Sequence, residues 1–222
     1  MTPQEVIDEA RILINDDNAL MPARFSDADL LGFVNQAMKR ACIVRPDLFI
    51  VSSSITPTAN QVDQELSSSV SRLLEINRVV GGGALGEVDK ETMDRSSPTW
   101  TTDTADTPVN WMRHPRNPRK YFLYPRPATG TQISAEYIEV PSDYTLSDTI
   151  GLPDSYKSAI IDAVVFLAEA LDNESIDGQR AKAFADMFMQ ALGADLAQRR
   201  LVDNEDGIVN EQQQTRSRNN NG

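Results

Sequence analysis

Four segments of the chain repeat apolar residues with the period of an α-helix. These segments cover about residues 3–15, 26–44, 153–173 and 176–202. In the third segment Ile160, Val164 and Leu167 recur at spacings of three or four, which is typical of a helix that buries one face. The pattern predicts one pair of helices near each end of the chain.

Two of these helices begin with recognisable capping signals. Thr2, Pro3 and Glu5 combine a Thr-x-x-Glu capping box with proline at the first helical position. Ser26 stands three residues before Asp29, so its hydroxyl is placed to cap the second helix. We expect both helices to begin at these residues.

Between the helical pairs, over about residues 49–141, the period changes from that of a helix to that of a strand. Residues 109–112 and 120–124 are predicted to pair as a hairpin, and residues 131–140 to add the next strand through a short connection. A further strand is predicted at 73–80, and a polar serine-rich connection precedes it at 56–71. One or two helical turns are predicted at 87–95. The expected fold is α+β, a helical bundle with an inserted antiparallel β-meander.

The composition changes after Val202. Residues 203–222 contain almost no apolar side chains, so this segment cannot bury enough surface to fold alone. We expect residues 1–202 to form a single domain, followed by a flexible C-terminal arm over 203–222. The arm is either a dispensable terminus or a segment that becomes ordered on a partner.

Charge and composition narrow the class of function. The chain has 222 residues, 40% of them hydrophobic, and a net charge of −12. This charge disfavours a protein that grips duplex DNA, because such affinity comes largely from Lys and Arg on phosphates.

Location can also be predicted from the sequence. The sequence has no apolar run long enough to cross a membrane. Its first residues have no basic or apolar signal regions, so we do not expect export. One cysteine, Cys42, fits synthesis in a reducing cytoplasm.

Candidate chemistry is sparse. Gly81, Gly83 and Gly86 match the spacing GxGxxG after a predicted strand, but the βαβ unit of a dinucleotide site does not follow. A flexible loop is the alternative interpretation. His114 is the only histidine and lies among arginines, which favours a solvated turn histidine over a general base. The sequence therefore indicates no enzyme, no cofactor and no metal site.

Acidic residues also cluster, but without an evident cleft. The cluster consists of Glu136, Glu139, Asp143, Asp148 and Asp154. In a chain with 33 acidic residues a solvated face explains such a cluster better than acid–base catalysis.

One stretch reverses the acidic character of the chain. Arg113, Arg116, Arg119 and Lys120 surround aromatic residues near the predicted hairpin turn. Such a loop can solvate a hairpin tip, stack on single-stranded nucleic acid, or contact the acidic surface of an identical neighbour or of a tail protein. Packing and subunit contact are favoured, because nucleic acid would need a wider basic field.

The order of motifs carries a resemblance. The stretches YFLYPRP, ISAEYIEVP, IGLPDSYKSAIIDAVVFLAEAL and FADMFMQAL follow one another, preceded by Trp100 and by Glu87-Val88-Asp89. Over about residues 27–192 this order is similar to that of the head-to-tail adaptor (connector) proteins of tailed bacteriophages.

The resemblance implies a structural virion protein at the head–tail junction. It implies a dodecameric ring that joins the portal ring to the nozzle or tube proteins of the tail. Double-stranded DNA would pass through this ring without specific binding. In such a protein the C-terminal arm docks on the portal, which assigns contacts to Ile208, Val209, Arg216 and Arg218. The alternatives are another tail-completion or tail-tube component, or a small nucleotide-binding enzyme using Gly81–Gly86.

Overall fold

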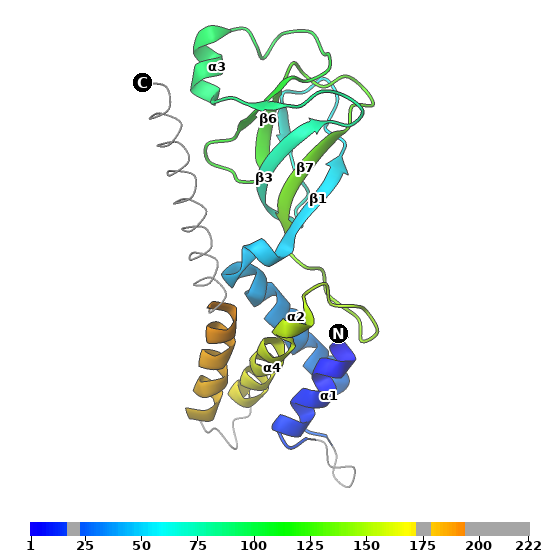
Figure 1. The fold of residues 1–222 in the computed structure, drawn as a ribbon, viewed down its shortest axis with the longest axis vertical. Helices are drawn as coiled ribbons and strands as arrows, with labels where there is room; N and C mark the ends of the chain where they lie inside the picture. The colour runs from blue at the N-terminus through cyan, green and yellow to red at the C-terminus, as the bar shows by residue number, and fades with distance from the viewer. Residues whose placement is uncertain (17–22, 172–178, 194–222) are drawn as a thin grey trace, which may run out of the picture. The chain divides into compact units, whose positions relative to one another are not determined.

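The computed structural model describes residues 1–16, 23–171 and 179–193. The chain divides into two compact units (Figure 1). The helical unit contains the described residues of Met1–Val44 and those from Asp143 onward, and the sheet unit contains Arg45–Ser142. The predicted α+β class, with strands inserted between two pairs of helices, is confirmed.

The helical unit follows the predicted helical period. It contains α1 (Pro3–Leu13), α2 (Asp27–Val44), the 3-10 turn η2 (Asp154–Tyr156), α4 (Lys157–Leu171) and a further helix over residues 179–193. The first helix ends before the predicted residue 15, because Asn15 has a positive φ of 54°, which lies outside the right-handed helical region. The predicted helical residues 172–173, 176–178 and 194–202 lie outside the described residues.

The predicted caps are present. The Thr2 hydroxyl accepts the Glu5 N–H at 3.3 Å, and the Glu5 carboxylate accepts the Thr2 N–H at 3.1 Å. Ser26 and Asp29 make the same reciprocal pair, at 3.2 and 3.0 Å. Hydrogen bonds from Ser26 lower the pKa of Asp29. Each cap stabilises its helix by about 1 kcal/mol.

The three helices α1, α2 and α4 pack against one another (Figure 1). Their apolar faces supply fully buried side chains, including Val6, Ile7, Leu30, Val34, Ile160 and Val164. Burying an aliphatic side chain of this size contributes about 1.5–3 kcal/mol. Apolar burial therefore holds this unit together.

The sheet unit contains seven strands and two short helical elements among the described residues. They are η1 (Pro46–Phe49), β1 (Ile50–Ile55), β2 (Asp63–Glu65), β3 (Val70–Val79), β4 (Gly86–Glu87), α3 (Lys90–Ser96), β5 (Asn110–Arg113), β6 (Lys120–Tyr124) and β7 (Ile133–Glu139). The strands form a three-stranded sheet in the order β1-β7-β3 and a four-stranded sheet in the order β2-β6-β5-β4. Only β4 and β5 pair in parallel among the described strands.

The hairpin of β5 and β6 is confirmed, but the connectivity beyond it is not a simple meander. Strand β7 does not continue from β6; it lies between β1 and β3 in the other sheet. Strand β2 lies inside the predicted polar connection. The physical reason is that β7 buries Ile133 and Ala135 between the sheets, which pairing beside β6 in one flat sheet would not allow.

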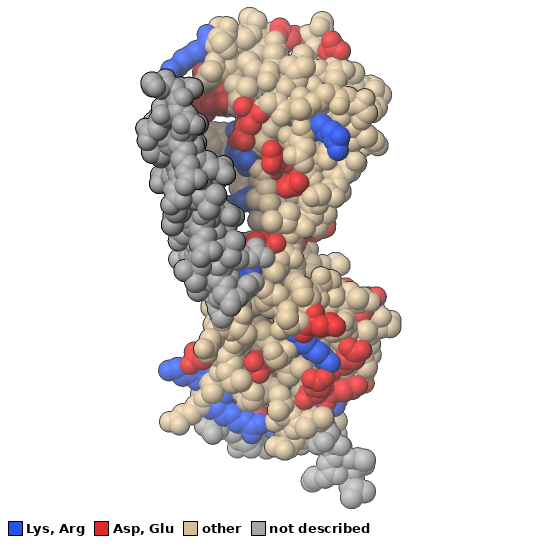
Figure 2. All heavy atoms as spheres, viewed as in Figure 1, with Lys and Arg blue, Asp and Glu red and all other residues tan. Residues whose placement is uncertain are grey.

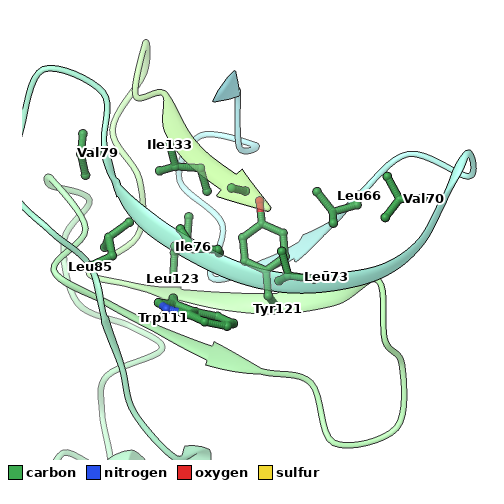
Figure 3. Close-up of a cluster of buried hydrophobic side chains, with 11 residues drawn as sticks. Leu66, Val70, Leu73, Ile76, Val79, Leu85, Trp111, Tyr121, Leu123 and Ile133 are labelled. Carbon is green, nitrogen blue, oxygen red and sulfur yellow. The ribbon is translucent and has the colours of Figure 1, made fainter. Parts of the chain in front are cut away.

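The two sheets enclose one apolar core (Figure 3). Trp111, Tyr121 and Leu123 of the β5–β6 hairpin are almost completely buried, and they belong to the same cluster as Leu73 and Ile76 of β3. Figure 3 shows these side chains gathered between the strands. The hairpin is therefore anchored by the side chains that it buries in this core.

The opposite face of the hairpin is also covered. Met112 packs with Met93 of α3 and with Trp100, and Phe122 joins them from β6. The Trp100 indole N–H donates to Asp94 at 2.9 Å, and its ring meets Phe122 edge to face at 5.9 Å. Both faces of β5 and β6 are thus fixed by packing.

Candidate functional site

The tip of the β5–β6 hairpin carries the four cationic residues that the sequence indicated. Arg113 ends β5 and is paired with Tyr121 of β6. Arg116 and Arg119 lie in the connecting turn, and Lys120 begins β6. All four therefore lie on one short segment of the hairpin whose strands supply Trp111, Tyr121 and Leu123 to the apolar core.

His114 organises the turn. Its Nδ1 atom accepts the backbone N–H groups of Arg116 at 3.2 Å and Asn117 at 3.0 Å. Its ring stacks on Phe122 at 5.6 Å, and the residue is half-buried. His114 therefore lies at the turn, as predicted, but it is only partly solvated, because its imidazole nitrogen accepts two turn N–H groups that lack a backbone partner.

Arg113 is committed to contacts within the sheet unit. Its Nε atom donates to Glu87 at 2.6 Å, and its Nη atoms donate to the carbonyls of Leu73, at 3.2 Å, and Leu74. The guanidinium also lies 4.8 Å from the centroid of the Trp111 ring. Arg113 therefore connects β3, β4 and β5.

Arg119 and Lys120 also meet carboxylates of their own unit. Arg119 donates to Glu65 at 3.2 Å, while Lys120 lies 3.6 Å from Asp63 and 3.7 Å from Glu65. Both acidic residues belong to β2, which pairs with β6. The acidic strand neutralises much of this end of the cationic segment.

A groove of about 420 Å³ lies beside the turn. One wall is Arg72 and Leu73 of β3, and the other is the turn around Arg116 and Pro118. The Leu73 N–H donates to the Pro118 carbonyl at 2.9 Å, which ties the turn to β3. We call this feature the basic groove.

Arg72 is a groove residue that the sequence analysis did not single out. It lies on β3 directly before the buried Leu73 and is exposed. Strand alternation could have indicated its exposure, but not its position beside the turn, because more than forty residues separate the two in sequence.

The glycine segment forms a turn between β3 and β4. Gly81 has a φ of 74°, a conformation that favours glycine, and the Gly83 carbonyl accepts the Val79 N–H at 3.0 Å. The following helix α3 spans Lys90–Ser96, and its first turn is capped by the Asp89 carboxylate, which accepts the Thr92 N–H at 3.1 Å. The helix start therefore presents a carboxylate where a phosphate would need backbone N–H groups.

The acidic residues clustered in sequence are separated between the two units. Glu136 and Glu139 lie on β7, where they accept hydrogen bonds from Asn77 and Ser69, whereas Asp143, Asp148 and Asp154 belong to the helical unit. The described residues contain no group of three His, Cys, Asp or Glu side chains that could hold a metal ion. Cys42 is buried, and burial raises the pKa of its thiol.

The helical unit exposes a second feature, an apolar groove of about 200 Å³. Ile43, Phe166, Phe188 and Met189 line it, and Ile43 is 80% exposed. Clustered apolar exposure of this kind is typical of surfaces that meet another protein. The predicted arm residues Ile208, Val209, Arg216 and Arg218 lie outside the described residues.

The face of the molecule drawn in Figure 2 carries acidic and basic side chains scattered among uncharged ones. The described atoms on this face form no broad basic field. None of the helices built from described residues is long and apolar enough to cross a membrane.

The sequence model of a family described as "SU10 adaptor protein" matches residues 1–214 of this chain. No curated protein matches the chain at a significant level.

Proposed function

Because the chain belongs to the SU10 adaptor protein family, a family of phage head-to-tail adaptors, we propose that it forms a ring joining the portal to the tail. Membership makes the chain a structural phage protein and a component of the virion. On our proposal, twelve copies form the ring, as the resemblance implies, and they continue the DNA channel. The match over residues 1–214 carries this conclusion.

Several observations support the proposed role. The net charge of −12 disfavours tight binding of DNA phosphates, so DNA can slide through a channel lined by such subunits. The exposed apolar groove around Ile43 and Met189 fits a protein that buries surface in an assembly.

Within this function, residues 1–202 act as one adaptor domain and residues 203–222 act as its arm. The arm contacts the portal through Ile208, Val209, Arg216 and Arg218. The cationic segment with Arg113, Arg116, Arg119 and Lys120 faces a neighbouring subunit or a tail protein.

The test is to measure assembly of the full chain on purified portal rings from the same phage. Mass measurement of the chain alone and with portal should show a large complex in the second case. A chain ending at residue 202 should bind portal much more weakly, and Ile208→Asp/Val209→Asp should reproduce that loss. Unchanged portal binding by both variants would overturn the proposed contact between the arm and the portal. Absence of portal binding by the full chain would overturn the proposed adaptor function.

A further inference from the structure

Two of the cations at the basic groove have no partner among the described residues. The guanidinium groups of Arg72 and Arg116 are exposed, and neither makes a hydrogen bond or ion pair with the part of the chain that the structure describes. By contrast, Arg113, Arg119 and Lys120 are held by Glu87, Glu65 and Asp63.

These two guanidinium groups are placed for one ligand. Arg72 lies on β3 and Arg116 on the turn, and both line the same groove of about 420 Å³. The hydrogen bond from Leu73 to the Pro118 carbonyl, at 2.9 Å, fixes the two walls to each other. Guanidinium groups bind carboxylates and phosphates through paired N–H donors. The groove therefore fits an anionic group that enters between them.

The surrounding charges distinguish a protein carboxylate from a nucleic acid. Asp63 and Glu65 lie beside the cationic segment on β2, and Glu87 lies on the other side on β4. A phosphate backbone carries its charges in a continuous row and would be repelled by these carboxylates. A peptide segment with one or two acidic side chains brings fewer negative charges near these carboxylates than a phosphate backbone does.

We infer that the basic groove binds an acidic segment of a second copy of this chain, through Arg72 and Arg116. Charge favours a second copy as the partner, because each chain has 33 acidic residues and only 21 basic ones. Described cations such as Arg113 and Lys120 are already paired within their own chain. The inference rests on the proposed ring, in which identical neighbours meet head to tail.

The experiment compares two charge-reversal variants of the full chain. Arg72→Glu/Arg116→Glu reverses the charge of both groove arginines, while Arg95→Glu is the control. Arg95 lies in the same unit, is 81% exposed and pairs only with Glu91 one helical turn away among the described residues. Circular dichroism and thermal unfolding first establish that both variants fold.

Self-association is then measured by sedimentation over a range of concentrations, with and without portal rings, at low and high salt. The double variant should associate at least about ten-fold more weakly than the wild-type chain, and Arg95→Glu should not. High salt should weaken the self-association of the wild-type chain and have little effect on that of the double variant.

Three results would overturn the inference. Equal self-association of the double variant and the wild-type chain would show that the groove does not contribute to the contact between copies, but it would not contradict the proposed ring. A wild-type chain that stays monomeric even with portal rings would remove both the groove contact and the proposed function. Saturable binding of a fluorescent single-stranded oligonucleotide, lost in the double variant, would assign the groove to nucleic acid.

Discussion

The Nε atom of Arg113 lies 2.6 Å from a carboxylate oxygen of Glu87, and the same guanidinium reaches the carbonyls of Leu73 and Leu74 on β3. The ion pair is half-exposed on both sides, so solvent screens it and it contributes little alone. The contacts to the β3 carbonyls and to the Trp111 ring are therefore expected to dominate the stabilisation.

This relationship predicts unequal effects of two substitutions. Arg113→Ala should lower the free energy of unfolding of the sheet unit by about 1–3 kcal/mol, because it removes charge-assisted hydrogen bonds to carbonyls. Glu87→Gln should cost less than about 1 kcal/mol. Urea unfolding followed by tryptophan fluorescence measures both, since Trp100 and Trp111, the two tryptophans of the chain, lie in the sheet unit. Equal losses would show that the ion pair dominates.

His114 is predicted to stabilise the hairpin turn. His114→Ala removes the acceptor of two backbone N–H groups and the stacking on Phe122. The expected cost is about 1–2 kcal/mol in the same fluorescence-detected unfolding. Arg116→Ala in the same turn is the control and should stay within about 0.5 kcal/mol, because its exposed guanidinium has no partner among the described residues. Similar losses in both variants would contradict the assigned role.

Tyr121 is predicted to make the sheet unit sensitive to alkaline pH. Burial raises the pKa of its phenol, whereas an unfolded tyrosine loses its proton near pH 10. The unfolded state therefore releases the proton first, and stability falls as pH rises above the unfolded value. Tyr121→Phe should reduce this loss and leave neutral stability nearly unchanged.

The matched variant Tyr121→Ala should cost about 3–5 kcal/mol at neutral pH, because it leaves a cavity in the core. This difference from the wild-type chain should shrink at alkaline pH, because the variant has no phenol at this position to titrate. Urea unfolding at neutral and alkaline pH measures both variants. If the free energy of unfolding of Tyr121→Phe falls with alkaline pH as steeply as that of the wild-type chain, Tyr121 is not the source of this pH dependence.

Asp162 is predicted to destabilise the helical unit at neutral pH. It is 9% exposed on α4, it makes no hydrogen bond or ion pair with the residues described, and burial raises the pKa of its carboxyl. The folded state therefore holds the proton to higher pH than the unfolded state, and stability is lost as pH rises through the folded pKa.

Asp162→Asn should raise the free energy of unfolding at pH 7 by on the order of 1 kcal/mol. The gain should shrink as pH falls towards about 4, where the wild-type carboxyl becomes protonated. Unfolding followed by far-ultraviolet circular dichroism reports the helices. A gain that does not change with pH would indicate a packing effect instead of a charge effect.

The sequence by itself determined the local elements. Helical period located α1, α2 and α4, and the side chains of Thr2, Glu5, Ser26 and Asp29 marked helix starts, because a cap is satisfied within four residues of the chain. The order of motifs also indicated the adaptor family that the match over residues 1–214 establishes. These features depend on neighbours in sequence.

Only the tertiary structure decided which strands meet and which charges remain available. Strand β7 lies between β1 and β3 because its apolar side chains are buried between two sheets, which periodicity of two cannot specify. The four cations near the turn look alike in sequence, yet Glu87, Glu65 and Asp63 pair with three of them. Arg72 joins Arg116 across the basic groove because strand pairing and turn geometry place distant residues together. Long-range contacts of this kind depend on the packed core, and local pattern does not encode them.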